Sequence, residues 1–523
     1  MRKLILASLT ISSSLAAQTT AGRPRTVPLR GSLEHRLAQL IDAPPFSRAT
    51  WGIYVVDDRG RVLYQRNADR LSVPASNTKL VVTAAAAVLL PSEYRVTTSL
   101  YVNGRVDAGV LSGDLILYGR GDPTWSARCY GVDTLAPGVC DSSFTAVDAI
   151  ADSIRAHGIR RITGKLVGDG SYFEPTLIHN GWNAWDLTWW YAAPVSGLGF
   201  HDNSVDFRIE PGPVVDAPPA ITWSPDLGLI TFENRARTVP SDSSSTVGDN
   251  FFRSGGGIGS TGGGGGGGPG GMEGWSIRAE GTVALGRKAR VESVALPDPN
   301  LYAARALAAA LARKGVAVQG GAASTTDSLA YRTLRCCASP LADFRGRPLP
   351  DIIFPILNSS HNWFAEMLLK LLGRELKGEG SWEAGLDVER RFLIDSVHID
   401  STAFALEDGS GLAAGNLVTP QAFAKLLAYM HSHPKGGAFV AGLPHAGQPG
   451  SLLKRFVGTS LDGRVIAKTG SIDRVNSLSG YIEPTNSRGR TITFSVQANG
   501  HAVPYSQMLA QIDSVVVEIG RTK

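Results

Sequence analysis

Two apolar segments near the start of the chain differ in period and predict different elements. From Thr50 to Gln65, β-branched and aromatic residues flank the turn residues of Asp57 to Gly60, which predicts a hairpin of two strands. From Lys79 to Leu90 the sequence is rich in Ala and Leu, is apolar on nearly all sides and is followed by Pro91. This second pattern predicts a helix buried in a domain core.

The pattern changes between Ser92 and about Val294, where short alternating segments are separated by Gly, Asp and Pro. Such segments predict a β-rich insertion. Inside it, the run from Gly255 to Gly271 is almost all glycine. Because this run has too few side chains to bury apolar surface against its ordering entropy, we expect a flexible surface loop.

Helical patterns return after the insertion, and strands follow near the end of the chain. The expected elements are helices at Leu301–Arg313 and Asn362–Leu376, strands at Arg464–Lys468, Leu478–Ile482 and Thr491–Gln497, and a helix at about Tyr505–Ile519. Together they predict a sheet closed by a terminal helix. That helix has too few Lys and Arg on its polar face for a membrane-surface helix, so we expect it to pack in the core.

Length and charge narrow the class of protein. With 523 residues, 43% of them apolar, the chain is long enough for two or three domains. The net charge is only +5, and the basic residues are spread along the chain, which argues against a nucleic-acid surface.

The first residues resemble a secretory signal. Arg2 and Lys3 precede the apolar run Leu4–Ile11, and small residues follow at Ala16 and Ala17. The run is far shorter than the roughly 20 residues that cross a bilayer. We therefore expect residues 1–17 to be a signal peptide that is cleaved near residue 17, leaving no stable membrane anchor.

The four cysteines form two close pairs. In an oxidising compartment Cys129 and Cys140 could close a short surface loop. The adjacent Cys336 and Cys337 are expected not to bond to each other, because the geometry is strained, which leaves free thiols or a bond to another group open. No Cys and His spacing suits zinc, so we expect no metal and no cofactor.

The segment Pro74-Ala-Ser76-Asn-Thr-Lys79 carries the first candidate chemistry. A spacing of three residues at a helix start places Ser76 and Lys79 on one face. A desolvated lysine can accept the serine proton, and a helix N-terminus favours developing negative charge. Taken alone, Ser-x-x-Lys also fits a helix cap with a lysine that faces solvent.

Two later motifs favour the catalytic interpretation of Ser76 and Lys79. Ser360-His-Asn362 stands just before a predicted helix, and Lys468-Thr469-Gly470 ends a predicted strand. Separately, they fit a helix cap and a strand followed by a turn. In this order the three motifs are a known signature of serine β-lactamases and penicillin-binding proteins. His361, in the middle of the second motif, is expected to be uninvolved.

From about Leu33 to its end the chain resembles the D-alanyl-D-alanine carboxypeptidase/endopeptidase family, the class C low-molecular-mass penicillin-binding proteins of peptidase family S13. Further matching segments are Gly119–Pro123, Gly181-Trp182, Ala193-Pro194, Asp408–Leu412, Leu443-Pro444 with Gly447, and Ser477–Tyr481. The first two motifs lie 284 positions apart, which fits this family and excludes an ordinary class A β-lactamase.

The resemblance implies an α/β (α+β) fold of the serine β-lactamase/transpeptidase type, interrupted by β-rich inserted domains. On this basis the catalytic domain comprises residues 30–92 and 295–523, and the nested insertion comprises residues 93–294. The implied activity is that of a serine-type D-Ala-D-Ala carboxypeptidase in the periplasm. Its implied partners are peptidoglycan peptides and β-lactam antibiotics, without nucleic acid.

The resemblance also implies roles for the motif residues. Ser76 would attack the penultimate D-alanine carbonyl, Lys79 would take its proton, and Ser360 would relay that proton to the leaving amine. The implied substrate-binding residues are Asn362 for the backbone amide, Lys468 and Thr469 for the terminal carboxylate, Gly470 of the same motif, and Ser471, whose N–H would complete the oxyanion hole with that of Ser76.

The pocket for the substrate's distal charged end matches the family at some positions and departs from it at another. Asp186 and Tyr191 match the acid and aromatic positions that flank the pocket for the substrate's distal ammonium. The family arginine after the Ser-Gly-Leu segment is absent, because Ala413–Asn416 stand there. We expect Asp186 to attract the ammonium and the grip on the distal carboxylate to be weak. The alternative is that Asp186 only caps a turn.

Two other functions remain open at this point. One is a β-lactamase-like or esterase hydrolase with the same motifs, and the other is a non-catalytic wall-binding protein on the same scaffold. The balance of carboxypeptidase and endopeptidase activity, the preference between lysine and diaminopimelate, and the oligomeric state also stay open.

Overall fold

The computed structural model describes residues 30–125, 144–254, 275–485 and 489–522. Several expectations lie outside these ranges: the signal peptide at 1–17, the pair Cys129 and Cys140, and the glycine run at 255–271. The described residues form two compact units. One contains residues 206–254 and 275–294, and the other contains the rest from Gly31 onward.

A five-stranded sheet is the centre of the larger unit, and its neighbouring strands are all antiparallel. In sheet order the strands are β2 (Val62–Arg66), β1 (Thr50–Asp57), β22 (Ile492–Asn499), β21 (Val475–Ile482) and β20 (Val465–Ile472). The predicted hairpin is therefore confirmed, and β1 joins it to the three strands at the end of the chain.

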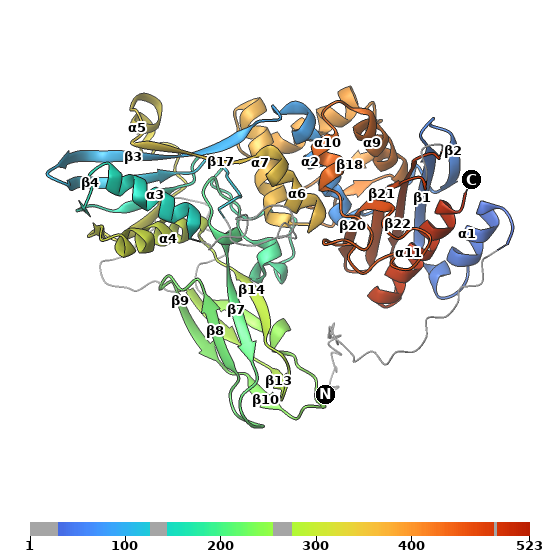
Figure 1. Ribbon diagram of the computed structural model, residues 1–523, viewed down its shortest axis with the longest axis horizontal. Coiled ribbons are helices and arrows are strands. Elements are labelled where there is room, and N and C mark those ends of the chain that lie inside the picture. The colour runs from blue at the N-terminus through green and yellow to red at the C-terminus, as the bar shows by residue number, and fades with distance from the viewer. Residues whose placement is uncertain (1–29, 126–143, 255–274, 486–488, 523) are drawn as a thin grey trace, which may run out of the picture. The chain divides into compact units, whose positions relative to one another are not determined.

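Two helices cover one face of this sheet: α1 (Leu33–Ile41) and α11 (Tyr505–Gly520) (Figure 1). Met508, Ile512, Val516 and Ile519 of α11 are fully buried against the apolar side chains of the strands. The expectation that this helix packs in the core is confirmed. No helix in the described ranges is long and apolar enough to cross a membrane.

On the other face, α9 (Pro420–Ser432) packs against β1, β21 and β22. Five more helices share an apolar cluster with it: α2 (Lys79–Leu89), α6 (Leu349–Asn358), α7 (Asn362–Lys377), α8 (Trp382–Arg391) and α10 (Gly437–Gly442). As predicted, α2 is buried nearly all round, because α6, α7, α8, α9 and α10 surround it. This packing places the N-terminal ends of α2 and α7 near β20.

A second, seven-stranded sheet belongs to the same unit. Its strands are β3 (Arg95–Asp107), β4 (Val110–Tyr118), β5 (Arg161–Ile162), β6 (Leu166–Asp169), β15 (Ala317–Val318), β16 (Ala322–Thr325) and β17 (Ala342–Pro348), and α3 (Thr145–Ala156) and α4 (Pro299–Arg313) accompany it. This sheet combines strands from before and after the segment at 206–294.

The smaller unit is built of strands around an aromatic core. Its strands are β7 (Ser204–Glu210), β8 (Ala220–Ser224), β9 (Ile230–Asn234), β10 (Arg237–Val239), β11 (Phe251–Ser254), β12 (Trp275–Ala279), β13 (Thr282–Ala284) and β14 (Arg290–Ala295). Phe207 contacts the rings of Trp223, Phe232 and Phe251. The mixture of helices and sheets confirms the α+β class.

Short elements complete the fold. They are η1 (Phe46–Arg48), η2 (Ala75–Thr78), η3 (Asp186–Thr188), η4 (Trp190–Ala192), η5 (His201–Asn203), η6 (Val247–Asp249), η7 (Phe392–Ser396), α5 (Arg332–Cys337), β18 (Phe404–Ala405) and β19 (Leu417–Val418). At the end of α5, Cys336 and Cys337 are joined by a disulfide bond. The expectation that these neighbours do not bond to each other is therefore wrong.

Candidate active site

Ser76 lies in the tight turn η2, immediately before α2, with its side chain partly exposed. The turn is fastened to the sheet, because Ser477 Oγ donates to Pro74 O at 2.7 Å and Asn77 Nδ2 donates to Ser479 Oγ at 2.8 Å. A side chain at Gly470 would overlap the Pro74 carbonyl. Glycine at this position therefore lets β20 approach the serine turn closely.

Lys79 is completely buried and points at Ser76. Its Nζ donates to Ser76 Oγ at 2.9 Å, to Asn362 Oδ1 at 2.7 Å and to the carbonyl oxygen of Ser410 at 2.6 Å. The alternative of a lysine that faces solvent is wrong. Burial lowers the pKa of Lys79 to about 7, against the opposing charges of Asp408 and Glu366. About half of the molecules therefore carry a neutral amine at pH 7.

Ser360 and Lys468 form a second contact beside the first. Lys468 Nζ donates to Ser360 Oγ at 2.8 Å and to the carbonyl oxygen of Thr469 at 2.8 Å. Ser360 joins α6 to α7 with a left-handed backbone, φ 64°. Burial and the charge of Lys79 hold the pKa of Lys468 well below its usual range. The site thus contains two buried amines, each bonded to a different serine.

Asn362 connects Lys79 to the backbone of Tyr191. Its Oδ1 accepts from Lys79, and its Nδ2 donates to Tyr191 O at 2.9 Å. His361, which the sequence suggested to be uninvolved, is the N-cap of α7: it accepts from Phe364 N at 3.3 Å. Its other ring nitrogen lies 3.2 Å from Asp202 Oδ2. His361 therefore fixes the helix end that carries Ser360 and Asn362.

The remaining candidates on β20 line the same side of the site. β20 is the last strand of its sheet, and Thr469 and Ser471 are partly exposed there. Thr469 Oγ1 donates to Ser451 Oγ at 3.1 Å, and Ser471 Oγ accepts from Asn476 Nδ2 at 2.8 Å. These bonds hold both hydroxyls in place.

Asp186 is linked to Asn362 by hydrogen bonds of Tyr191. It is partly exposed in η3, and its Oδ1 accepts from Tyr191 OH at 3.0 Å. Burial raises the pKa of Asp186, while the bond from Tyr191 opposes that rise. Since Tyr191 also accepts from Asn362, the acid is connected to the motif residues by two consecutive hydrogen bonds.

Sequence reasoning missed the buried carboxylates beneath Lys79. Asp408 accepts from Gly411 N and Ala413 N, each at 2.7 Å, and it begins the noted Asp408–Leu412 segment without having been given a role. Glu366 accepts from Ser410 N at 2.7 Å. The available signal was an acid four residues after Asn362, on the same face of the helix and within its mostly apolar segment from Trp363 to Leu369.

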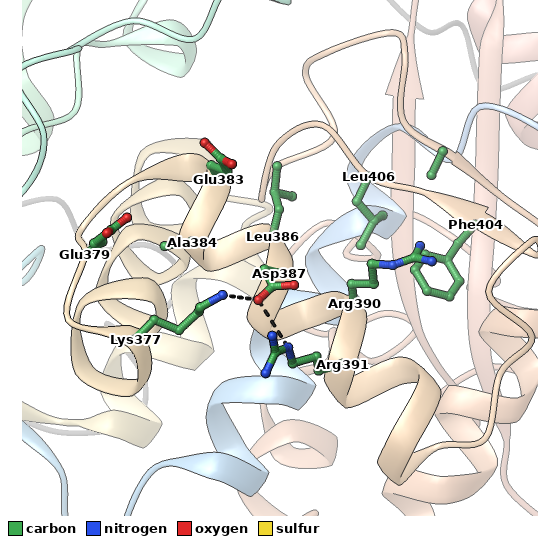
Figure 2. Close-up of a pocket in the computed structure, with 11 residues that line it drawn as sticks. Lys377, Glu379, Glu383, Ala384, Leu386, Asp387, Arg390, Arg391, Phe404 and Leu406 are labelled. Atoms are coloured by element: carbon green, nitrogen blue, oxygen red, sulfur yellow. Dashed lines mark hydrogen bonds and ion pairs between the residues drawn. The ribbon is translucent and has the colours of Figure 1, made fainter.

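The motif residues do not line the cavity drawn in Figure 2, which has a volume of about 740 Å³. Its walls come from α8 and the segment around β18, and Asp387 there bonds both Lys377 and Arg391. Within the described ranges, no group of three or more His, Cys, Asp or Glu residues could hold a metal ion.

Comparisons with known proteins agree over nearly the whole chain. The model of the D-Ala-D-Ala carboxypeptidase 3 (S13) family matches residues 33–255 and 272–518. A D-alanyl-D-alanine carboxypeptidase of Actinomadura sp. (strain R39) is 29% identical over 525 residues, which covers 98% of this chain and 88% of the relative. The D-alanyl-D-alanine carboxypeptidase DacB of Haemophilus influenzae is 24% identical, covering 85% of this chain and 84% of the relative.

A solved structure shares the fold. The crystal structure of penicillin binding protein 4 (dacB) from Haemophilus influenzae superposes with a TM-score of 0.73 at 21% identity. The superposition covers 94% of this chain and 98% of the other. The predicted α+β fold of the transpeptidase type is confirmed.

Proposed function

The chain belongs to the D-Ala-D-Ala carboxypeptidase 3 (S13) family, and from this premise we propose that Ser76 is its nucleophile and Lys79 the base that activates it. The family membership predicted from the motifs is confirmed. The protein is a serine-type carboxypeptidase/endopeptidase of the penicillin-binding class. The contact that supports these roles is that of the buried Lys79 amine with Ser76 Oγ at 2.9 Å.

In the proposed first step, Lys79 accepts the proton of Ser76 while Oγ attacks the carbonyl of the penultimate D-alanine. The negative charge on the carbonyl oxygen lies between the N–H groups of Ser76 and Ser471. The peptide bond then breaks, and the proton reaches the leaving amine by way of Ser360. Water hydrolyses the remaining ester, which returns the serine.

Substrate binding in this proposal uses the other motif residues. Asn362 holds a backbone amide of the substrate, and Lys468 with Thr469 attracts its terminal carboxylate. β20 supports this, because a terminal strand can accept an extended peptide alongside it at Gly470. Asp186 is proposed for the distal ammonium of the substrate, since it accepts from the hydroxyl of Tyr191, whose backbone oxygen accepts from Asn362.

We further propose that the chain acts in the periplasm on peptidoglycan peptides and is acylated by β-lactams. Export rests on the signal-like residues 1–17. The proposed division is a catalytic domain at 30–92 and 295–523 around an insertion at 93–294. A β-lactamase-like hydrolase is the alternative.

Release of D-alanine from a stem peptide that ends in D-Ala-D-Ala tests this function. The wild type should shorten the peptide by one residue, measured by mass, and Ser76→Ala should not. Ser514→Ala is the matched control, because Ser514 is also a partly exposed serine but lies on α11. Release by Ser76→Ala would refute the assignment of the nucleophile. Rapid turnover of penicillin without peptide cleavage would favour the β-lactamase-like alternative.

A further inference from the structure

Glu366 is a buried carboxylate one turn along α7 from Asn362. Its Oε1 accepts from Ser410 N at 2.7 Å. Its Oε2 accepts from Trp382 Nε1 at 2.8 Å and from Gly409 N at 3.2 Å. One side chain therefore holds the N–H groups of two consecutive residues, Gly409 and Ser410.

The carbonyl oxygen of Ser410 is one of the three acceptors of Lys79 Nζ, at 2.6 Å. Ser410 thus donates its N–H to Glu366 and accepts from Lys79 through its carbonyl oxygen. The next residue, Gly411, has a left-handed backbone, and a side chain there would overlap the carbonyl oxygen of Ala75, just before Ser76. The segment around Gly411 therefore packs directly against the turn that carries Ser76.

Asp408 closes the same segment from its other end, through bonds from Gly411 N and Ala413 N. Together, Glu366 and Asp408 accept from four backbone N–H groups, those of Gly409, Ser410, Gly411 and Ala413. Because these bonds are buried, breaking one leaves a polar group without a partner and away from water, which is unfavourable. The orientation of the Ser410 carbonyl is therefore fixed by the two carboxylates rather than by solvent.

We propose that Glu366 is a positioning residue for Lys79: it aims the Ser410 carbonyl at the amine and supplies negative charge that stabilises the ammonium form. The inference rests on the proposed role of Lys79 as the base. Glu366 itself contacts neither Ser76 nor the reacting bond, and it acts through the Gly409–Ser410 peptide group and through charge.

The charges around Lys79 come from three elements. Glu366 on α7 and Asp408 in the loop after β18 raise its pKa, while burial lowers it to about 7. Lys468 on β20 is the neighbouring amine, and burial and then the charge of Lys79 lower its own pKa. Removal of the Glu366 charge should therefore lower the pKa of Lys79 further. The acid limb of the acylation rate, which requires neutral Lys79, should then move to lower pH.

Glu366 has charged neighbours of its own. Burial and then the charge of Asp408 raise its pKa to about 7, so Glu366 acts on Lys79 as a negative charge only in its ionised fraction, which grows from pH 5 to 9. Lys370, one turn further along α7, feels the Glu366 charge. Glu389 on α8 is also buried, and its pKa lies well above the usual range because of burial and the charges of Glu366 and Asp408.

Glu366→Gln is the test, read out as the acylation rate of the full chain by a fluorescent penicillin between pH 5 and 9. An amide has one acceptor oxygen and cannot replace both carboxylate oxygens. We expect the rate on the high-pH plateau to fall on the order of 10²-fold, because the base is misplaced. We also expect the midpoint of the acid limb to fall below that of the wild type.

Glu389→Gln is the matched control. It makes the same change in the same buried cluster, but neither carboxyl oxygen of Glu389 has a hydrogen-bond partner among the described residues. Since Glu389 is not among the charges that act on the pKa of Lys79, its plateau and midpoint should equal those of the wild type.

Glu366→Asp separates charge from geometry, and it also serves if Glu366→Gln fails to fold. It should lose rate on the plateau but keep the wild-type midpoint, because the negative charge remains. A wild-type plateau and midpoint in Glu366→Gln would overturn the inference, and so would a Glu366→Asp midpoint as low as that expected for Glu366→Gln. If the wild type itself is not acylated, the proposed function fails instead, which keeps the two failures distinct.

Discussion

The low proton affinity of Lys79 predicts how acylation depends on pH and on the identity of residue 79. Lys79→Arg is the informative perturbation, because it keeps a cation and hydrogen-bond donors beside Ser76 but removes the base. A guanidinium stays protonated throughout the working range, whereas a buried lysine can be neutral. The substitution therefore separates the charge of residue 79 from its ability to accept a proton.

The size of the effect follows from burial of the amine. A fall of the Lys79 pKa from 10.5 to about 7 corresponds to roughly 5 kcal/mol between the two protonation states. It raises the neutral fraction at pH 7 about 10³-fold. Between pH 6 and pH 8 the neutral fraction should rise about tenfold, and the acylation rate with it. Loss of a general base typically costs about 10² to 10⁴ in rate.

Stopped-flow measurement of acylation by a fluorescent penicillin gives both quantities. The wild type should show a rising limb centred near pH 7, and Lys79→Arg should be slower by the factor expected for a lost base at every pH. Lys425→Arg is the control, because Lys425 is an exposed lysine on α9. A wild-type rate that is flat between pH 6 and pH 8 would contradict a Lys79 pKa near 7, and wild-type rates in Lys79→Arg would refute the assignment of Lys79 as the base.

Two further variants change Asp186, which is proposed to bind substrate, and Gly411, which packs against the serine turn. Asp186→Asn should lower kcat/KM for lysine- and diaminopimelate-containing peptides alike, by roughly 1–3 kcal/mol, because a charged contact to the substrate ammonium is lost; unchanged kinetics with both peptides would remove Asp186 from substrate binding. Gly411→Ala should lower both the melting temperature and the acylation rate, because its side chain would overlap the Ala75 carbonyl. Gly500→Ala is its control, since that glycine also has a left-handed backbone but open space around it; equal melting temperatures in the two variants would contradict the close packing.

Local patterns predicted what depends on neighbours in sequence. The hairpin of β1 and β2 needs only alternation and a turn, and the facing of Ser76 and Lys79 needs only the spacing of a helical turn. The insertion of β22 beside β1 could not be foreseen in this way, because its hydrogen bonds join segments more than 400 residues apart.

The site shows the same limit. The contact of Lys468 with Ser360 joins two motifs through tertiary packing, so only the resemblance suggested that they meet. Glu366 carried no motif, and its role emerges only when the backbone of Ser410 is placed between it and Lys79. The bond between Cys336 and Cys337 was not predicted, because sequence alone does not give the backbone conformation that decides whether two adjacent cysteines can bond.

The central claim is that Ser76 carries the acyl group, and mass spectrometry of the penicillin-treated protein tests it most directly. After proteolysis, the wild type should carry the penicilloyl mass on the peptide that contains Ser76 and on no other serine peptide. Ser76→Ala, with an unchanged melting temperature, should carry none. A penicilloyl mass on another residue of the wild type, or covalent labelling of Ser76→Ala, would contradict the account.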